Sequence, residues 1–322
     1  MLRRKVMNYW GVGLMALCHL SLGWSAEYPI RPVRMVVGLG AGGGSDTVAR
    51  LLASKLTQAL GQTVVVDNRP SAGGVIACEV VAKAAPDGYT LLAMSPTHVV
   101  TPILRPSVGY DALRDFSPIL LSVYTPYVLS VKQSIPITNL KELIALAKTQ
   151  KLNFSSSGVG GASHLTAELF KHMAGIDMIH VPYKSGSQAN SALMSGEVSM
   201  SFTAIGGLVG YIQSGRIRAL GVTSLKRASA LPDIPTISEA GVPGYEVLGW
   251  YGLGATAHTP PAVIQKLNQV VNRVLPDLRE PYARIGTEIA GGSVEQFRDY
   301  LLQEIQKWTR VIEFSGAKAH SQ

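Results

Sequence analysis

The chain has 322 residues, of which 47% are hydrophobic and 16% are charged, so it can bury a sizeable core, which argues against wholesale disorder. Its formal net charge is +8, but no long run of basic residues accompanies this charge, which argues against nucleic-acid binding. A mild excess of positive charge would instead help to attract a small anion.

The first 25 residues have the anatomy of a secretory signal peptide. Basic residues at 3–5 precede an apolar run of 13 residues at 10–22, and small residues follow. The run is shorter than the roughly 20 residues that span a bilayer, which disfavours a membrane anchor. We therefore expect cleavage after Ser25 or Ala26 and a periplasmic location. The mature chain then carries a net charge of +5, from 26 Lys and Arg against 21 Asp and Glu.

The inventory of reactive side chains offers little for catalysis or metal binding. Cys78 is the only cysteine of the mature chain, which excludes an intrachain disulfide and a thiolate metal site. The histidines lack metal-ligand spacing, and the motifs G-x-S-x-G and H-E-x-x-H and the P-loop lysine are absent. We therefore expect no enzyme activity, no metal and no cofactor, with Cys78 as a buried hydrophobic residue.

Apolar β-branched runs alternate with amphipathic stretches, which predicts an α/β architecture with mainly parallel strands. In the first part of the mature chain the expected strands are 33–37, 63–66 and 89–94. The first helix begins at Ser45 or Asp46 and stops before Gly61, and a second covers about 76–84. A loop rich in Pro and Tyr then extends to residue 126.

The second part of the chain repeats the same pattern. The expected strands are 127–131, 152–154, 178–181, 198–202 and 217–223; the expected helices are 140–148, one that ends at Gly175, and two strong ones around 263–274 and 294–312. A strand, a glycine-rich loop and a helix occur in this order twice, about 115 residues apart, which suggests two lobes of similar construction. We expect one domain to comprise 26–123 plus 247–322 and the other to comprise 124–246.

The two glycine-rich loops, 38–44 and 155–163, are candidate anion sites. Each leads into a helix N-terminus, where unpaired N–H groups and the helix dipole favour negative charge. Both loops would lie at the carboxyl ends of strands, where open α/β sheets bind ligands. Ser95 and Thr97 end another strand at the same edge and can donate hydroxyl hydrogen bonds.

A dinucleotide-binding enzyme is an alternative. Gly38, Gly40 and Gly43 satisfy G-x-G-x-x-G, and Asp67 ends the second strand, where a ribose-binding acid belongs. Against this interpretation, Asp46 would place a carboxylate close to the pyrophosphate of an NAD(P) cofactor. Nicotinamide cofactors are also scarce outside the cytoplasm.

A set of short stretches, spread in order over essentially the whole mature chain, matches one known family. These stretches are 28–34, 42–46, 49–50, 68–74, 85–92, 156–158, 164–165, 168–171, 180–184, 218–220, 231–236 and 249–252. Through them the chain resembles the Bug proteins of Bordetella, which are substrate-binding components of tripartite tricarboxylate transporters.

This resemblance implies a type II periplasmic-binding-protein fold, a Venus flytrap of two α/β domains joined by a hinge. It further implies a monomer that holds a small carboxylate or similar polar metabolite and docks on the membrane permease subunits of the transporter. The residues expected to face the ligand are Gly42, Gly43, Gly44, Ser45, Asp46, Ser95, Thr97, Ser157, Gly158, His164, Tyr183 and Thr203.

Some positions depart from the family pattern. Gly38 and Leu39 stand where Pro-Phe is common, and Ser199 and Thr203 stand where Asp is frequent. These changes bear on which ligand is preferred rather than on the fold. A periplasmic sensor that reports its ligand to a membrane kinase would use the same cleft, so the sequence leaves that alternative open.

Overall fold

The computed structural model describes residues 28–183 and 186–316. The expected signal peptide lies outside these residues. Within the described ranges, no helix combines the length and the hydropathy that a membrane crossing requires.

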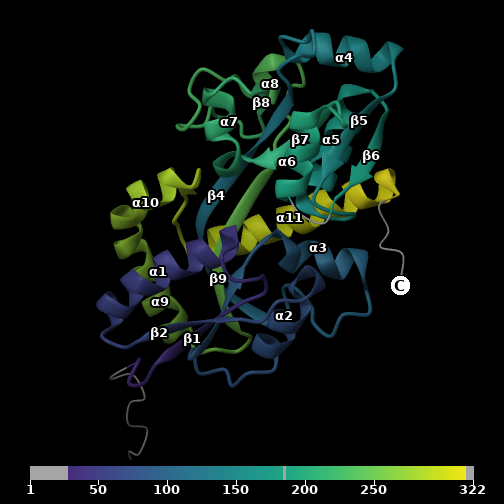
Figure 1. Cartoon of the computed structure of the whole chain (residues 1–322). Helices are drawn as coiled ribbons and strands as arrows, with labels where there is room; N and C mark the ends of the chain where they lie inside the picture. Colours follow the sequence, from purple (N-terminus) through teal and green to yellow (C-terminus); the bar gives the residue numbers. More distant parts are fainter. Residues whose placement is uncertain (1–27, 184–185, 317–322) are drawn as a thin grey trace, which may run out of the picture.

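The molecule has two lobes, each built around its own sheet (Figure 1). The first lobe contains the strands in the order β2-β1-β3-β9-β4, with β10 paired to β4. Its first elements are β1 (Val33–Val37), α1 (Gly44–Leu60), β2 (Val64–Asn68), the short helix η1 (Ala72–Gly74), α2 (Val75–Ala82), β3 (Thr90–Met94) and α3 (Pro96–Leu104). The chain returns to this lobe with β9 (Leu248–Thr256), α9 (Pro261–Val274), η3 (Leu275–Leu278), α10 (Arg279–Arg284) and β10 (Glu288–Ile289).

The second lobe has the strand order β4-β7-β5-β6, and β8 also pairs with β4. Its elements are α4 (Leu140–Thr149), β5 (Leu152–Ser156), α5 (Ala162–Ala174), β6 (Met178–Pro182), α6 (Gly186–Ser195), β7 (Met200–Ala204), η2 (Ile205–Gly207), α7 (Val209–Gln213), β8 (Ile217–Val222) and α8 (Ile237–Ala240). The C-terminal helix α11 (Val294–Ser315) packs against α3 and β4 and also against α5, so it contacts both lobes (Figure 1).

The strand β4 (Phe116–Lys132) belongs to both sheets. Its first part pairs with β9 as far as Pro126, and from Tyr127 onward it pairs with β7 and β8. Thr223 ties this crossing to the returning chain, because its hydroxyl accepts the Tyr127 N–H at 2.8 Å and donates to the Val247 carbonyl at 2.5 Å. The chain therefore crosses between the lobes at two adjacent, hydrogen-bonded points.

The two-lobed α/β class predicted from the sequence is confirmed, and most of the expected elements lie within a few residues of their predicted bounds. The parallel pairs are β1 with β2 and β3, and β5 with β6 and β7, whereas the pairs that involve β4 or β9 are antiparallel. The expectation of mainly parallel strands therefore holds for the former strands and was wrong for the central ones, because β4 and β9 carry the chain between the lobes. The expected loop before residue 127 was wrong, because α3 and the first part of β4 occupy most of it. Pro118 and Pro126 conceal the strand in the sequence, and a register shift beside Pro118 accommodates the missing N–H.

A buried carboxylate joins α11 to the central strands. Glu304 is 2% exposed and accepts hydrogen bonds from the indole N–H of Trp250 at 3.0 Å and of Trp308 at 2.9 Å. Lys307 pairs with its other oxygen. Because every oxygen has a donor, this charge can be buried without the cost of an unpaired ion.

Two glycines bring the lobes into backbone contact. Gly206 of η2 lies against Gly286, which follows α10, and a Cβ at Gly286 would be 2.6 Å from the Gly206 nitrogen. The Thr125 hydroxyl donates to the Gly286 carbonyl at 3.0 Å, which fixes that residue against β4. Only residues without side chains allow this approach.

Gly286→Ala should therefore lower the free energy of unfolding more than Gly→Ala at another left-handed glycine that has free space around it. Gly175 is the matched control, because its φ of +62° is close to the +69° of Gly286 but a Cβ there meets nothing within 4 Å. The left-handed backbone costs about 1–2 kcal/mol in Gly175→Ala, and overpacking raises the loss to roughly 3 kcal/mol in Gly286→Ala. Urea unfolding measures both values, and equal losses would contradict the tight contact between the lobes.

Candidate functional site

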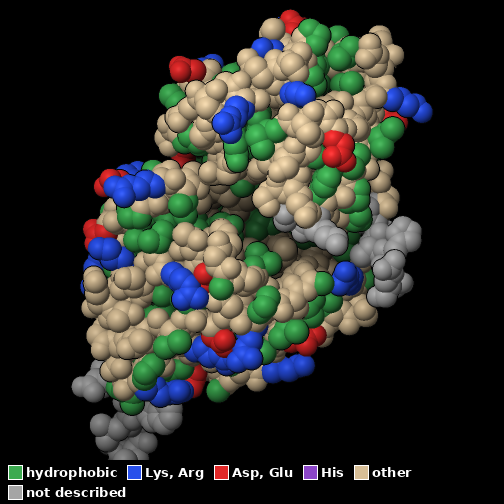
Figure 2. All heavy atoms as spheres, in the orientation of Figure 1, with side chains coloured by type: hydrophobic (Ala, Val, Ile, Leu, Met, Phe, Trp, Pro, Cys, Tyr) green, Lys and Arg blue, Asp and Glu red, His purple; other side chains and the backbone are tan. Residues whose placement is uncertain are grey.

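The surface is hollowed between the two lobes (Figure 2). The first turn of α1 reaches the strands that cross there, since a Cβ at Gly44 would lie 2.9 Å from the Tyr251 hydroxyl of β9. The loop before α5 touches the opposite lobe, since a Cβ at Gly160 would lie 2.7 Å from Leu104 at the end of α3. Both glycine-rich loops therefore lie where the lobes meet.

The first loop is held in place by Asp46. Gly43 caps α1 in an extended conformation and Gly42 has a φ of +79°. The Asp46 carboxylate accepts the Gly42 N–H at 2.9 Å and pairs with the Arg50 guanidinium, also at 2.9 Å. The hydrogen bond from Arg50 is the main reason why the pKa of Asp46 is lowered, although burial acts in the opposite direction. The carboxylate thus fastens its own loop and has a cation beside it.

The N-terminus of α1, which Asp46 holds in place, has backbone N–H groups without an acceptor. Within the described residues, the N–H groups of Gly44, Ser45 and Asp46 have no backbone acceptor. The Ser45 side chain is buried at the same end of the helix. Open N–H groups together with the helix dipole form a site that favours an anion.

Side-chain hydroxyls also lie at the N-terminus of α3, which directly follows β3. The hydroxyls of Ser95 and Thr97 are 3.0 Å apart at the beginning of α3. They border a small hollow of about 10 Å³ that also touches Gly38 and Gly74. This volume holds about one water molecule and no larger ligand.

The second loop is braced by its own serines. The Ser163 hydroxyl accepts the Ser157 N–H at 3.0 Å, and the Ser156 hydroxyl accepts the Gly158 N–H at 3.1 Å. Gly161 caps α5, so the N–H groups of the first turn again have no backbone acceptor within the described chain. This end of α5 repeats the donor arrangement of α1.

Two stacked imidazoles, those of His164 and His180, hold the second loop in place. The Gly160 N–H donates to Nδ1 of His164 at 3.0 Å, and the His164 ring stacks on His180 with 3.9 Å between centroids. Burial, the neighbouring imidazole and Lys171 lower the pKa of His164 to about 3, and burial lowers that of His180 to about 4. Glu168 lies 3.7 Å from Nε2 of His164. Both rings are neutral near pH 7, and His164 shapes the loop rather than adding charge to it.

The remaining two predicted ligand residues bond within the second lobe. The Tyr183 hydroxyl donates to Glu197 at 2.8 Å, and the Thr203 hydroxyl donates to Asn190 at 2.8 Å. The structure therefore groups the predicted residues into the first loop, the start of α3 and the second loop, with these two hydroxyls engaged by side chains of their own lobe. The role of each as a ligand contact stays a prediction.

Sequence reasoning missed Tyr251, which lies beside the first loop, and Tyr127, which lies near Tyr251. Tyr251 reaches Gly44, and the Tyr127 hydroxyl lies 3.2 Å from where a Cβ of Gly249 would be. Tyr251 lies in the 249–252 stretch that carries the family resemblance, but it is not among the residues expected to face the ligand. Tyr127 carried no local signal, because its approach to Gly249 depends on the pairing of the neighbouring Thr125 with Gly249 between β4 and β9.

The geometry gives no support to the dinucleotide alternative. Asp67, the proposed ribose-binding acid, accepts from Arg34 at 2.8 Å and from Arg69 at 3.0 Å. The hydrogen bond from Arg34 is the main cause of its lowered pKa. A carboxylate engaged by two arginines is poorly placed to bind a ribose.

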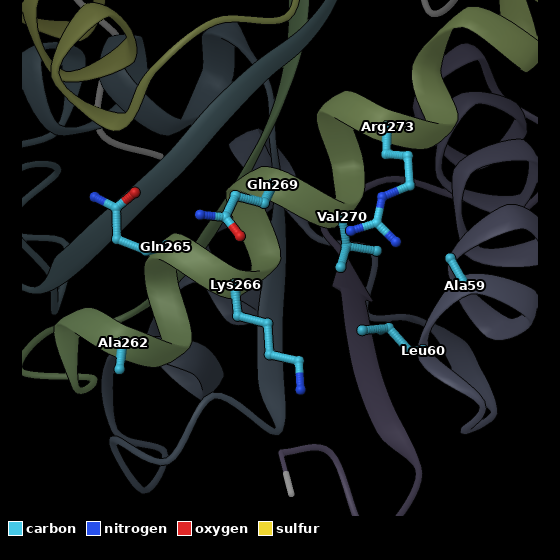
Figure 3. A pocket seen from close by; sticks show the side chains of 8 residues that line it. All are labelled: Ala59, Leu60, Ala262, Gln265, Lys266, Gln269, Val270 and Arg273. Carbon is cyan, nitrogen blue, oxygen red and sulfur yellow. The ribbon is translucent and has the colours of Figure 1, made fainter. Parts of the chain in front are cut away.

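A separate groove of about 410 Å³ lies between α1 and α9 (Figure 3). Lys266, Gln269 and Arg273 project from α9 beside Ala59 and Leu60 of α1. These α1 residues stand about 22 Å along the helix from its first turn. The groove contains none of the predicted ligand residues.

A two-lobed α/β fold with open helix N-termini around the hollow between the lobes defines a solute-binding protein. The family model described as "Tripartite tricarboxylate transporter family receptor" matches residues 48–317. The chain therefore belongs to this family, and the resemblance to the Bug proteins is confirmed.

Solved structures agree with this assignment. R. palustris Rpa4515 with adipate is 36% identical, with a TM-score of 0.79 over 90% of this chain and 99% of that one. The periplasmic binding protein BugD is 34% identical, with a TM-score of 0.76 over 91% and 100%. MatC (Rpa3494) of Rhodopseudomonas palustris with bound malate is 31% identical, with a TM-score of 0.74 over 88% and 100%.

The neutral His164 predicts a pH dependence of stability. In the unfolded chain an imidazole binds its proton near pH 6.5, but the folded protein binds it only near pH 3. Between these values the unfolded state binds more protons, so the free energy of unfolding falls as the pH is lowered from about 6.5. His164→Asn keeps an acceptor for the Gly160 N–H but does not titrate, so its curve should be shallower by about 1.4 kcal/mol per pH unit between pH 6 and 4.

Urea unfolding at a series of pH values measures the two curves. Parallel curves for the wild type and His164→Asn would show that His164 contributes nothing to the pH dependence.

Proposed function

We propose that this protein is a periplasmic, non-catalytic receptor that captures a small carboxylate in the hollow between its lobes and delivers it to a tripartite tricarboxylate-type transporter. The observation that carries the proposal is the pair of glycine-rich loops that start α1 and α5 where the lobes meet, with open N–H groups in the first turn of each helix. Backbone donors of this kind bind carboxylates without a positively charged side chain.

The electrostatics of the loops support an anionic ligand. Asp46 is the acid nearest to the first loop, and Arg50 lies against it. The second loop rests on the neutral imidazoles of His164 and His180. Two related structures have adipate and malate bound, so dicarboxylates are the first ligands to test.

The crossing points supply the hinge. We assign residues 26–123 and 247–322 to one domain and 124–246 to the other, with the Tyr127–Thr223–Val247 hydrogen bonds at the pivot. Closure of such domains on a ligand shifts an open–closed equilibrium. A monomer is sufficient for this mechanism.

A thermal-shift screen tests carboxylate capture. Succinate, malate, adipate and citrate are compared with NAD(H) and with a neutral amide, each at increasing concentration. A true ligand at 100 times its Kd should stabilise the protein by about 2.7 kcal/mol, because it binds only the folded state. Binding of NAD(H) with no response to any carboxylate would refute the proposal.

Gly43→Val is the site-specific variant for this screen. The φ of Gly43 is −78°, so valine fits the backbone, and its nearest neighbour would be the Gly40 carbonyl at 3.3 Å. The added side chain should block close approach to the N–H groups and abolish the ligand-induced shift. Gly210→Val in α7, where a Cβ meets nothing within 4 Å, is the control that should keep the shift.

The membrane partner is tested by affinity capture with detergent-solubilised membranes of the source bacterium. Immobilised protein saturated with its ligand should retain the permease subunits, and Gly43→Val in the same buffer should retain less because it cannot close on ligand. Retention of a membrane histidine kinase in place of the permease would instead assign a sensor function.

A further inference from the structure

The sequence Gly249-Trp250-Tyr251-Gly252 in β9 uses its two faces differently. Trp250 is buried against Glu304 of α11, and Gly252 leaves room for the Phe297 ring on the same helix. Gly249 instead faces the Tyr127 hydroxyl, and Tyr251 contacts the first turn of α1. Packing against α11 thus explains one part of the motif and leaves the other unexplained.

The unexplained part places the Tyr251 hydroxyl beside the first turn of α1 and the Tyr127 hydroxyl beside Gly249, two residues before Tyr251 in β9. The Tyr251 hydroxyl would be 2.9 Å from a Cβ at Gly44, the first residue of α1. The Tyr127 hydroxyl would be 3.2 Å from a Cβ at Gly249. Each hydroxyl occupies space that a side chain at the facing glycine would fill.

Neither hydroxyl has a hydrogen-bond partner within the described part of the chain. Among those residues the fully enclosed side-chain atoms that lack a partner are Asp46 Oδ1, Ser122 Oγ and Ser201 Oγ. The oxygens of Tyr127 and Tyr251 are not among them, so they are not completely enclosed by protein. Burial of the rings raises the pKa of Tyr251 to about 12 and that of Tyr127 further. Both are therefore neutral hydrogen-bond donors at any physiological pH.

Two buried tyrosines outside this region, Tyr245 and Tyr110, use their hydroxyls internally. Tyr245 donates to the Thr166 carbonyl at 2.8 Å, and Tyr110 donates to the His98 carbonyl at 3.2 Å. When a tyrosine ring is largely covered and its hydroxyl has no partner in the protein, the hydroxyl forms its hydrogen bond with solvent or with a ligand.

We propose that Tyr127 and Tyr251 form the floor of the ligand site and donate hydrogen bonds to a carboxylate oxygen held at the N-terminus of α1. The inference rests on the proposed function and deepens it. Neutral hydroxyl donors beside open N–H groups match an anionic group of the ligand, and the positive end of the helix dipole disfavours an ammonium group there. The two tyrosines thereby select the end of the ligand that enters the first lobe.

The test uses Tyr127→Phe, Tyr251→Phe and the double variant, each titrated calorimetrically with malate and adipate. Loss of one hydrogen bond to a charged group should raise the Kd by roughly ten- to a hundredfold per variant. The melting temperature of the ligand-free protein should not fall, because no internal hydrogen bond is lost. Tyr245→Phe is the matched control: it breaks an internal bond, so it should lower the melting temperature and leave the Kd unchanged.

The outcomes separate the two claims. Wild-type affinity in both single variants and in the double variant would show that the hydroxyls are only hydrated and would overturn the inference, while the proposed function stands. Failure of the wild type to bind any carboxylate would overturn the proposed function and this inference with it. If a Tyr→Phe variant binds more weakly and also loses as much melting temperature as the Tyr245→Phe control, the tyrosine hydroxyls serve the fold. That result would also overturn the inference.

Discussion

The rest of the structure depends on one constraint, which is that a single strand takes part in both sheets. β4 leaves β9 after Pro126 and joins β7 and β8 from Tyr127, so the lobes cannot be placed independently of each other. Thr223 binds both crossing segments and keeps them adjacent. Because the helices that follow β1 and β5 start at the carboxyl ends of their strands, this arrangement brings both glycine-rich loops to the junction.

Around both loops the side-chain charges are neutralised, either by pairing or by burial, while the backbone N–H donors stay open. Asp46 is paired with Arg50, and the imidazoles of His164 and His180 are kept neutral by burial. A fixed cation would hold an anion tightly whatever its shape, whereas N–H groups and hydroxyls require correct geometry. Such a site can release its ligand when the lobes open, because no ion pair has to be broken.

The parts of this protein that sequence predicts are those that local patterns determine. The glycine-rich loops, the cap at Gly175 and the strand 33–37 were all recognisable, since each depends on residues close in the chain. The first part of β4 was not, because its prolines conceal a strand that long-range pairing stabilises. The same holds for the site: the partners of Tyr183 and Thr203, and the meeting of Tyr127 with Gly249, arise from tertiary contacts.

The departures from the family pattern can be separated on the same physical basis. The Ser199 hydroxyl bonds to Asn153 at 2.9 Å and that of Thr203 to Asn190 at 2.8 Å, so these positions act within the second lobe. Gly38 is different, because a Cβ there would lie 2.9 Å from the Gly74 Cα. Glycine at this position lets the first loop pack directly on η1, next to Ser95 and Thr97. Ligand preference should therefore be set by the shape of the first loop and by neutral hydroxyls, rather than by the acids absent from the second lobe.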